Sequence, residues 1–170
     1  MNNTGSDDHI EVFPAERLIA FSAAILANAG ADEPTAHDAT RAMFHASLHG
    51  IDSHGFRLLP HYRAAIQGGR LNGTPDMIFT QTRPGAGTLD ADHAHGARAM
   101  YEAASRAADL AREAGIAAVG IRNSSHYGAA GAYALELAMR GLGALVFGNS
   151  NSLVRLHDGA TRFHGTNPIA

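Results

Sequence analysis

Four histidines lie within the segment HASLHGIDSHGFRLLPHY: His45, His49, His54 and His61. Imidazole is the side chain best suited to exchange protons near neutral pH, and it is also a common metal ligand. Such a cluster is therefore compatible with metal binding or with acid–base catalysis. Both require that the surrounding elements hold the side chains at a suitable spacing.

The metal interpretation rests on His45 and His49, which are four residues apart and share one face of a predicted helix. A zincin helix has this spacing, but Ala46 stands where such a helix carries its glutamate. No third ligand is marked, and a chain without cysteine has no thiolate site. We therefore expect no metal, and we expect His49 to interact with the C-terminal end of the helix dipole.

The loop GIDSHGF is a better candidate for chemistry because His54 lies there between two predicted helices. Ser53 can orient the imidazole ring, and Gly55 allows a ligand to approach the backbone. Arg57 offers a guanidinium fork for a carboxylate. The alternative is a simple turn in which the serine caps the next helix.

A second loop, RNSSHYGAAGAYA (residues 122–134), joins a predicted strand to a predicted helix. We expect Ser124 or Ser125 to cap that helix, leaving backbone N–H groups accessible to an anion. Gly128 and Gly131 do not complete a Rossmann G-x-G-x-x-G motif, and tight helix–strand packing is the alternative. Further on, FGNSNS ends a predicted strand and GTNP forms a predicted turn, positions that often line a ligand crevice.

The elements that position these loops follow from hydrophobic spacing and from glycine and proline. We predict helices over 14–30, 32–50 and 57–69, with Asp32 as an N-cap. One or two short strands follow within 75–92, then a helix over 96–115, a buried strand over 116–123, a helix over 128–141 and a strand over 142–150. The order predicts an α/β fold with a flexible tail (1–11), an N-terminal helical region (12–72) and an α/β part (73–170).

Composition excludes several classes of protein. The 170 residues carry a net charge of −3, which does not suit a nucleic-acid surface or a basic membrane patch. No apolar run approaches the ~20 residues that span a bilayer. The absence of cysteine and a polar N-terminus favour a cytoplasmic protein.

Taken together, GIDSHGFRLLPHY, GIAAVGIRNSSHYGAAGAYA, GNSNS and HGTNPIA resemble, in order and spacing, the malate/L-lactate dehydrogenase family, which includes ureidoglycolate and sulfolactate dehydrogenases. The resemblance covers residues 12–170. Family members are roughly twice as long, so we expect the chain to correspond to an N-terminal half that ends inside the cofactor-binding part. It implies an N-terminal helical region followed by part of a non-Rossmann NAD(P)-binding α/β domain.

The same resemblance implies reversible hydride transfer between NAD or NADP and a small 2-oxo or 2-hydroxy acid, in a homodimer. It makes His54 the acid–base group, with Ser53 orienting it and His126 facing the same site. It makes Arg57 and Tyr62 substrate-binding residues. The residues implied in cofactor binding are Gly128, Asn149, Ser150, Thr166 and Asn167.

Two departures from the family pattern qualify these expectations. The usual arginine position is Leu58 here, and Arg57 comes one residue earlier, which turns a helical side chain by about 100°. The segment before GTNP contains Asp158, which would repel a phosphate and so favours NAD over NADP. We also expect the chain to be poorly active or inactive alone, and the alternative function is a dimerisation or interaction module.

Overall fold

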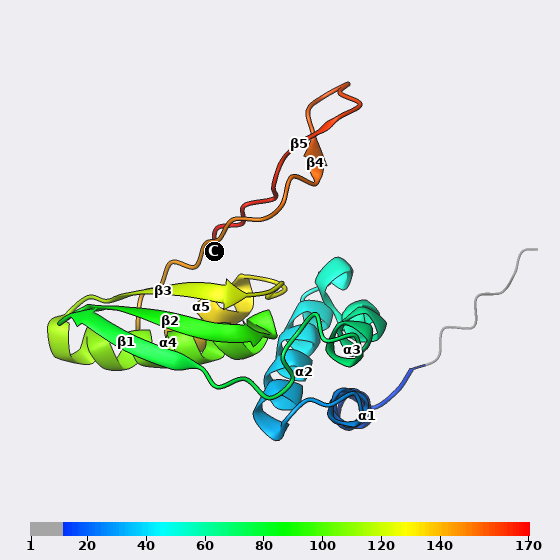
Figure 1. The fold of residues 1–170 in the computed structure, drawn as a ribbon, viewed down its shortest axis with the longest axis horizontal. Coiled ribbons are helices and arrows are strands. Elements are labelled where there is room, and N and C mark those ends of the chain that lie inside the picture. The colour runs from blue at the N-terminus through cyan, green and yellow to red at the C-terminus, as the bar shows by residue number, and fades with distance from the viewer. Residues whose placement is uncertain (1–11) are drawn as a thin grey trace, which may run out of the picture.

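The computed structural model describes residues 12–170, so the predicted flexible tail over 1–11 lies outside the described residues. Three helices open the described chain, α1 (Ala15–Asn28), α2 (Glu33–Leu48) and α3 (Leu59–Gln67). Two short 3₁₀ turns, Asp52–His54 and Phe56–Leu58, connect α2 to α3. Figure 1 shows these helices beside a small sheet, with the segment labelled β4 and β5 extending away from both. The prediction of three opening helices is confirmed.

The three helices pack around a common apolar core. Leu26 on α1, Met43 on α2 and Leu59 and Tyr62 on α3 are all buried in it. Asp32 caps α2 as predicted, because its carboxylate accepts a 2.8 Å hydrogen bond from the N–H of Thr35. We refer to this core as the helical cluster.

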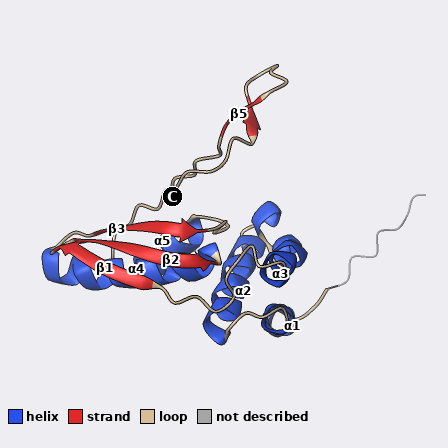
Figure 2. Ribbon diagram, viewed as in Figure 1, coloured by secondary structure: helices blue, strands red, loops and turns tan. Residues whose placement is uncertain are grey.

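The sheet contains β1 (Ile78–Arg83), β2 (Ala86–Ala94) and β3 (Ala118–Ser124) in the order β1-β2-β3. β1 and β2 are antiparallel, whereas β2 and β3 run parallel and are connected through α4 (Gly96–Ala114). Figure 2 shows α4 lying along one face of the sheet. Leu89 and Ala91 of β2 pack there against Ala99 and Ala103 of α4. The mixed α/β fold is therefore confirmed.

Helix α2 links the helical cluster to the α/β part. Ala42 of α2 is buried with Tyr101 of α4 and Tyr133 of α5 (Gly131–Met139). The guanidinium of Arg41 lies 4.2 Å from the centre of the Tyr101 ring and forms an ion pair with Glu136 on α5. Cation–π and ionic contacts thus fix α2 against both helices.

Two predictions about strands are wrong. The strand predicted as buried, β3, is half-buried on one side and exposed on the other, because α4 covers a single face of an edge strand. The strand predicted over 142–150 forms one isolated bridge, Phe147 with Ile169, instead of a ladder. An apolar run becomes a strand only where a partner strand supplies hydrogen bonds, and this run pairs only at that one point.

Residues 148–168 form an extension that we call the C-terminal arm. It contains a two-stranded ladder, β4 (Val154–Arg155) with β5 (Arg162–His164). Figure 1 shows it projecting from the body of the molecule. Leu153, Leu156 and Phe163 are exposed along it. Among residues 12–170, no helix combines the length and apolar character needed to cross a membrane.

Candidate acid–base site

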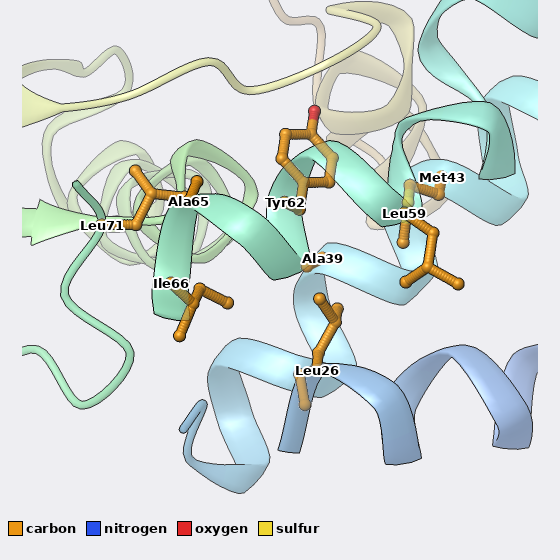
Figure 3. Close-up of a cluster of buried hydrophobic side chains, with 9 residues drawn as sticks. Leu26, Ala39, Met43, Leu59, Tyr62, Ala65, Ile66 and Leu71 are labelled. Atoms are coloured by element: carbon orange, nitrogen blue, oxygen red, sulfur yellow. The ribbon is translucent and has the colours of Figure 1, made fainter. Parts of the chain in front are cut away.

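Tyr62 connects the helical cluster to the predicted site. Its ring is buried in the cluster, whereas its hydroxyl points away from Leu26 and Ala39, as Figure 3 shows. Burial raises the pKa of the phenol, so Tyr62 keeps its proton over the whole physiological range. The cluster therefore holds a neutral O–H donor in a fixed direction.

That donor meets His126, which lies in the loop between β3 and α5. The Tyr62 hydroxyl and Nδ1 of His126 are 2.8 Å apart. A neutral imidazole that accepts at Nδ1 carries its proton on Nε2. In the arrangement in which the Tyr62 hydroxyl donates, Nε2–H of His126 is the free donor.

His54 completes a pair of rings at the same place. It lies in the first 3₁₀ turn, and its ring stacks on His126 with centroids 5.3 Å apart and an interplanar angle of 24°. The Ser53 hydroxyl lies 2.9 Å from Nδ1 of His54, so it orients the ring and does not cap α3. The structure thus brings together His54, Ser53, Tyr62 and His126, four residues that the sequence proposed for one site.

The electrostatics of the pair favour one positive charge at most. Partial burial lowers the pKa of His126, and the positive charges of His54, His61 and Arg70 lower it further. Two stacked imidazoles at this separation disfavour a state in which both are protonated. His126 is therefore neutral near pH 7.

Arg57 makes none of the contacts of this site. Its side chain is exposed and has no ion pair or hydrogen bond within residues 12–170, whereas the neighbouring Leu58 packs against the helical cluster. Arg70 is the cation whose charge acts on both Tyr62 and His126, and it lies 3.0 Å from Nε2 of His61. Sequence reasoning did not single out Arg70, because no motif contains it.

Two local predictions in these loops are wrong. Neither Ser124 nor Ser125 caps α5, which begins only at Gly131; the Ser125 hydroxyl instead accepts a 3.0 Å hydrogen bond from the N–H of Gly96 at the start of α4. Gly55 is tightly packed against Ser47 of α2 and is buried, so it serves packing and does not open the backbone to a ligand. Both contacts join segments distant in sequence, which local patterns cannot reveal.

His95 is a further site residue that sequence reasoning missed. It is 1% exposed, its Nδ1 accepts a 3.1 Å hydrogen bond from the N–H of Ala97, and it thereby caps α4. Its ring meets the ring of Tyr62 edge to face, with centroids 4.1 Å apart. A histidine immediately before a helix glycine was the only indication in the sequence.

The predicted cofactor-binding residues form two groups. Ser150, Thr166 and Asn167 meet at the base of the C-terminal arm, where Asn167 accepts from the N–H of Ser150 at 3.0 Å and the Ser150 hydroxyl from the N–H of Thr166 at 2.9 Å. Asn149 is exposed beside them. Gly128 lies in the His126 loop with φ +80°, and a side-chain carbon there would meet no atom within 4 Å, so the loop is open to a ligand.

The other histidines of the segment have structural positions. His49 ends α2, and its Nδ1 lies 2.8 Å from the carbonyl oxygen of His45, as expected for a residue near the helix C-terminus. The two rings stack with centroids 4.2 Å apart. Within the described part of the chain, no three His, Asp or Glu side chains gather in a way that would hold a metal ion.

Comparisons with known proteins agree with the resemblance in the sequence. The family model described as malate/L-lactate dehydrogenase matches residues 13–170. Malate dehydrogenase from Pyrococcus abyssi is 36% identical over 96% of this chain and 45% of its own length. The (2R)-3-sulfolactate dehydrogenase (NADP(+)) of Chromohalobacter salexigens is 38% identical over 76% of this chain and 39% of its own length.

The fold agrees as well. The structure of malate dehydrogenase from Pyrococcus horikoshii OT3 superposes with a TM-score of 0.89 at 33% identity, over 99% of this chain and 48% of that chain. The chain thus spans about half the length of the relatives it matches.

Proposed function

Because the chain belongs to the malate/L-lactate dehydrogenase family, we propose that it forms the acid–base side of a site for hydride transfer between NAD(P)H and a small 2-oxo or 2-hydroxy acid. The observation that carries the proposal is the convergence of His54, Tyr62 and His126 from three separate segments. Two of these are imidazoles, the groups best matched to proton transfer near neutral pH.

The proton donor in the proposal is His54. NAD(P)H, when bound, supplies the hydride, and the carbonyl oxygen that gains negative charge then needs a proton. The Ser53 hydroxyl lies 2.9 Å from Nδ1 of His54, so Nε2 is the ring atom left to exchange a proton with the substrate. His126, held by Tyr62, offers its Nε2–H as a hydrogen bond to the same substrate. In the oxidation direction His54 accepts the hydroxyl proton.

The substrate carboxylate needs a cation, and the chain offers two. Arg57 is proposed as its partner on the grounds that it is exposed and has no other ionic partner within residues 12–170. Arg70 is the competing cation, because its charge already acts on Tyr62 and His126. Substituting each arginine by alanine and measuring KM for the 2-oxo acid distinguishes them, since loss of a carboxylate contact raises KM.

The cofactor contacts in the proposal are Gly128, Asn149, Ser150, Thr166 and Asn167. NAD is favoured over NADP through the charge of Asp158, although that residue lies in the turn at the tip of the C-terminal arm, away from the polar group at its base. A relative named for NADP(+) shows that both nucleotides must be compared.

The test is a turnover assay with NADH and NADPH against pyruvate, oxaloacetate and larger 2-oxo acids. We expect little oxidation of the reduced nucleotide by this chain alone. In a full-length family member that carries the same Ser-His-Gly motif, we expect replacement of the histidine that matches His54 by asparagine to lower kcat about 10²–10⁴-fold. If neither the substitution that matches His54→Asn nor the one that matches His126→Asn lowered kcat, the two histidines would have no role in proton transfer.

A second candidate, self-association in a homodimer, is favoured by the exposed apolar side chains Leu153, Leu156 and Phe163 on the C-terminal arm. Light scattering with and without NADH separates the two functions. A dimer that shows no nucleotide-dependent rise in Tm and no turnover supports an interaction module.

A further inference from the structure

His95 is the most buried polar side chain next to the proposed site, and the proposed mechanism gives it no task. It occupies the junction between β2 and α4, and its ring lies against the ring of Tyr62 with an interplanar angle of 77°. Its Nδ1 is used as the cap of α4, but Nε2 has no hydrogen-bond partner within residues 12–170. A buried polar atom without a partner is rare and calls for an explanation.

The protonation state of His95 follows from its surroundings. Burial lowers its pKa to about 3, and the positive charges of His126 and His61 act in the same direction. The ring is therefore neutral at pH 7. Since Nδ1 accepts from the N–H of Ala97, the single ring proton is on Nε2.

We propose that His95 is a positioning residue that holds the ring of Tyr62 edge to face, so that the Tyr62 hydroxyl stays on Nδ1 of His126. The Nε2–H group without a conventional partner is satisfied by the electron-rich face of the Tyr62 ring. The catalytic meaning of this contact rests on the proposed function, but the contact itself does not.

The geometry explains why such a residue is needed. The lower part of the Tyr62 ring is fixed by the helical cluster, but its hydroxyl lies outside that cluster (Figure 3). His126 comes from a loop that precedes α5, so the 2.8 Å contact joins two segments that are 64 residues apart in the sequence. His95 contacts the Tyr62 ring from the start of α4. At the same helix start, the hydroxyl of Ser125, the neighbour of His126, accepts a hydrogen bond from the N–H of Gly96.

The consequence is measurable at His126 in this chain, without substrate or cofactor. The groups that face His126 are His54, Tyr62, His61, Arg70 and, through Tyr62, His95. A hydrogen bond from Tyr62 to Nδ1 stabilises the neutral ring and so lowers the pKa of His126. Loss of that bond raises this pKa by about half to one pH unit.

The experiment is an NMR titration of the His126 imidazole in three variants. Tyr62→Phe sets the size of the effect by removing the hydroxyl. His95→Asn keeps a side-chain acceptor for the cap of α4 but lacks the ring, whereas His95→Phe keeps a ring against Tyr62 but lacks the cap. We expect His95→Asn to reproduce most of the rise seen in Tyr62→Phe. We expect His95→Phe to keep the pKa of His126 low while its Tm falls by about 2–4 °C.

Several outcomes overturn the proposal: an unchanged His126 pKa in His95→Asn, an equal rise in both His95 variants, or no rise in Tyr62→Phe. If His95→Asn does not fold, His95→Phe alone decides, because a raised His126 pKa in that variant contradicts the role of the ring. The proposed function fails separately, if asparagine at the position of His54 leaves kcat unchanged in a full-length family member. That failure would leave the present result standing, so the two failures are distinguishable.

Discussion

The histidine site and the C-terminal arm both gather polar side chains that the family pattern connects with function, but they are held differently. His54, Tyr62, His95 and His126 come from four separate segments and are anchored by buried helices. Ser150, Thr166 and Asn167 contact one another across the arm, while Leu153, Leu156 and Phe163 remain exposed beyond them. The difference indicates that the histidine site is preorganised by this chain's own core, whereas the hydrogen bonds found for the polar group of the arm within residues 12–170 lie inside the arm.

The largest effect that sharpens this comparison is on stability. Leu26→Ala removes a side chain that is 0% exposed beneath Tyr62, and we expect it to lower the free energy of unfolding by about 2–5 kcal/mol. Phe163→Ala on the arm, where the side chain is 66% exposed, is the matched control and should change it by less than about 0.5 kcal/mol. Urea unfolding measures both, and equal effects would contradict the contrast between the two regions.

A smaller effect follows from the neutral state of His95. Its pKa is lowered to about 3 in the folded protein and is ordinary in the unfolded chain, so between these values the unfolded chain binds more protons. The stabilisation is complete above about pH 6.5 and is lost as the pH falls toward 3, at a slope of at most ~1.4 kcal/mol per pH unit.

The measurement is the free energy of unfolding between pH 7 and pH 4 for the wild type and for His95→Asn. We expect the variant to show a shallower decline, because it has no imidazole to protonate at this position. Equal slopes in the two proteins would mean that His95 is not held neutral by the fold.

The smallest effect concerns the two arginines near the site. Arg70→Ala removes a positive charge that acts on His126, so we expect the pKa of His126 to rise by a few tenths of a pH unit. Arg57→Ala is the matched control and should leave it unchanged. NMR titration of His126 in both variants measures this pKa. A larger rise of the His126 pKa in Arg57→Ala than in Arg70→Ala would mean that Arg57, and not Arg70, is the cation that acts on His126.

Much of the fold could be predicted because it depends on local patterns. The Asp32 cap and the apolar spacing of α4 both depend on residues that are close together in the sequence. The strand predicted over 142–150 failed because an apolar run does not reveal whether a partner strand exists. Likewise, the burial of β3 depended on whether a second layer covers its outer face.

The site was predictable in part for the same reason. His54 and Ser53 are neighbours, so their contact could be anticipated, whereas the contact of Tyr62 with His126 was expected only through the family resemblance. The partner of Ser125 and the burial of His95 come from the packing of α4 against the loop after β3, which no local motif records. For Arg57 the family pattern was a weaker guide. It stands one residue before the family's arginine position, and its side chain is exposed.

The central claim, that the His54–His126 pair carries the acid–base chemistry of a 2-hydroxy acid dehydrogenase, is tested most directly by the turnover of the 2-oxo acid that gives the fastest oxidation of the reduced nucleotide. Because we expect this chain alone to be poorly active, the substitution is made in a full-length family member that carries the same Ser-His-Gly motif. There we expect kcat to fall about 10²–10⁴-fold, with an unchanged Tm, when the histidine that matches His54 is replaced by asparagine. Retention of the wild-type kcat in that variant would contradict the account.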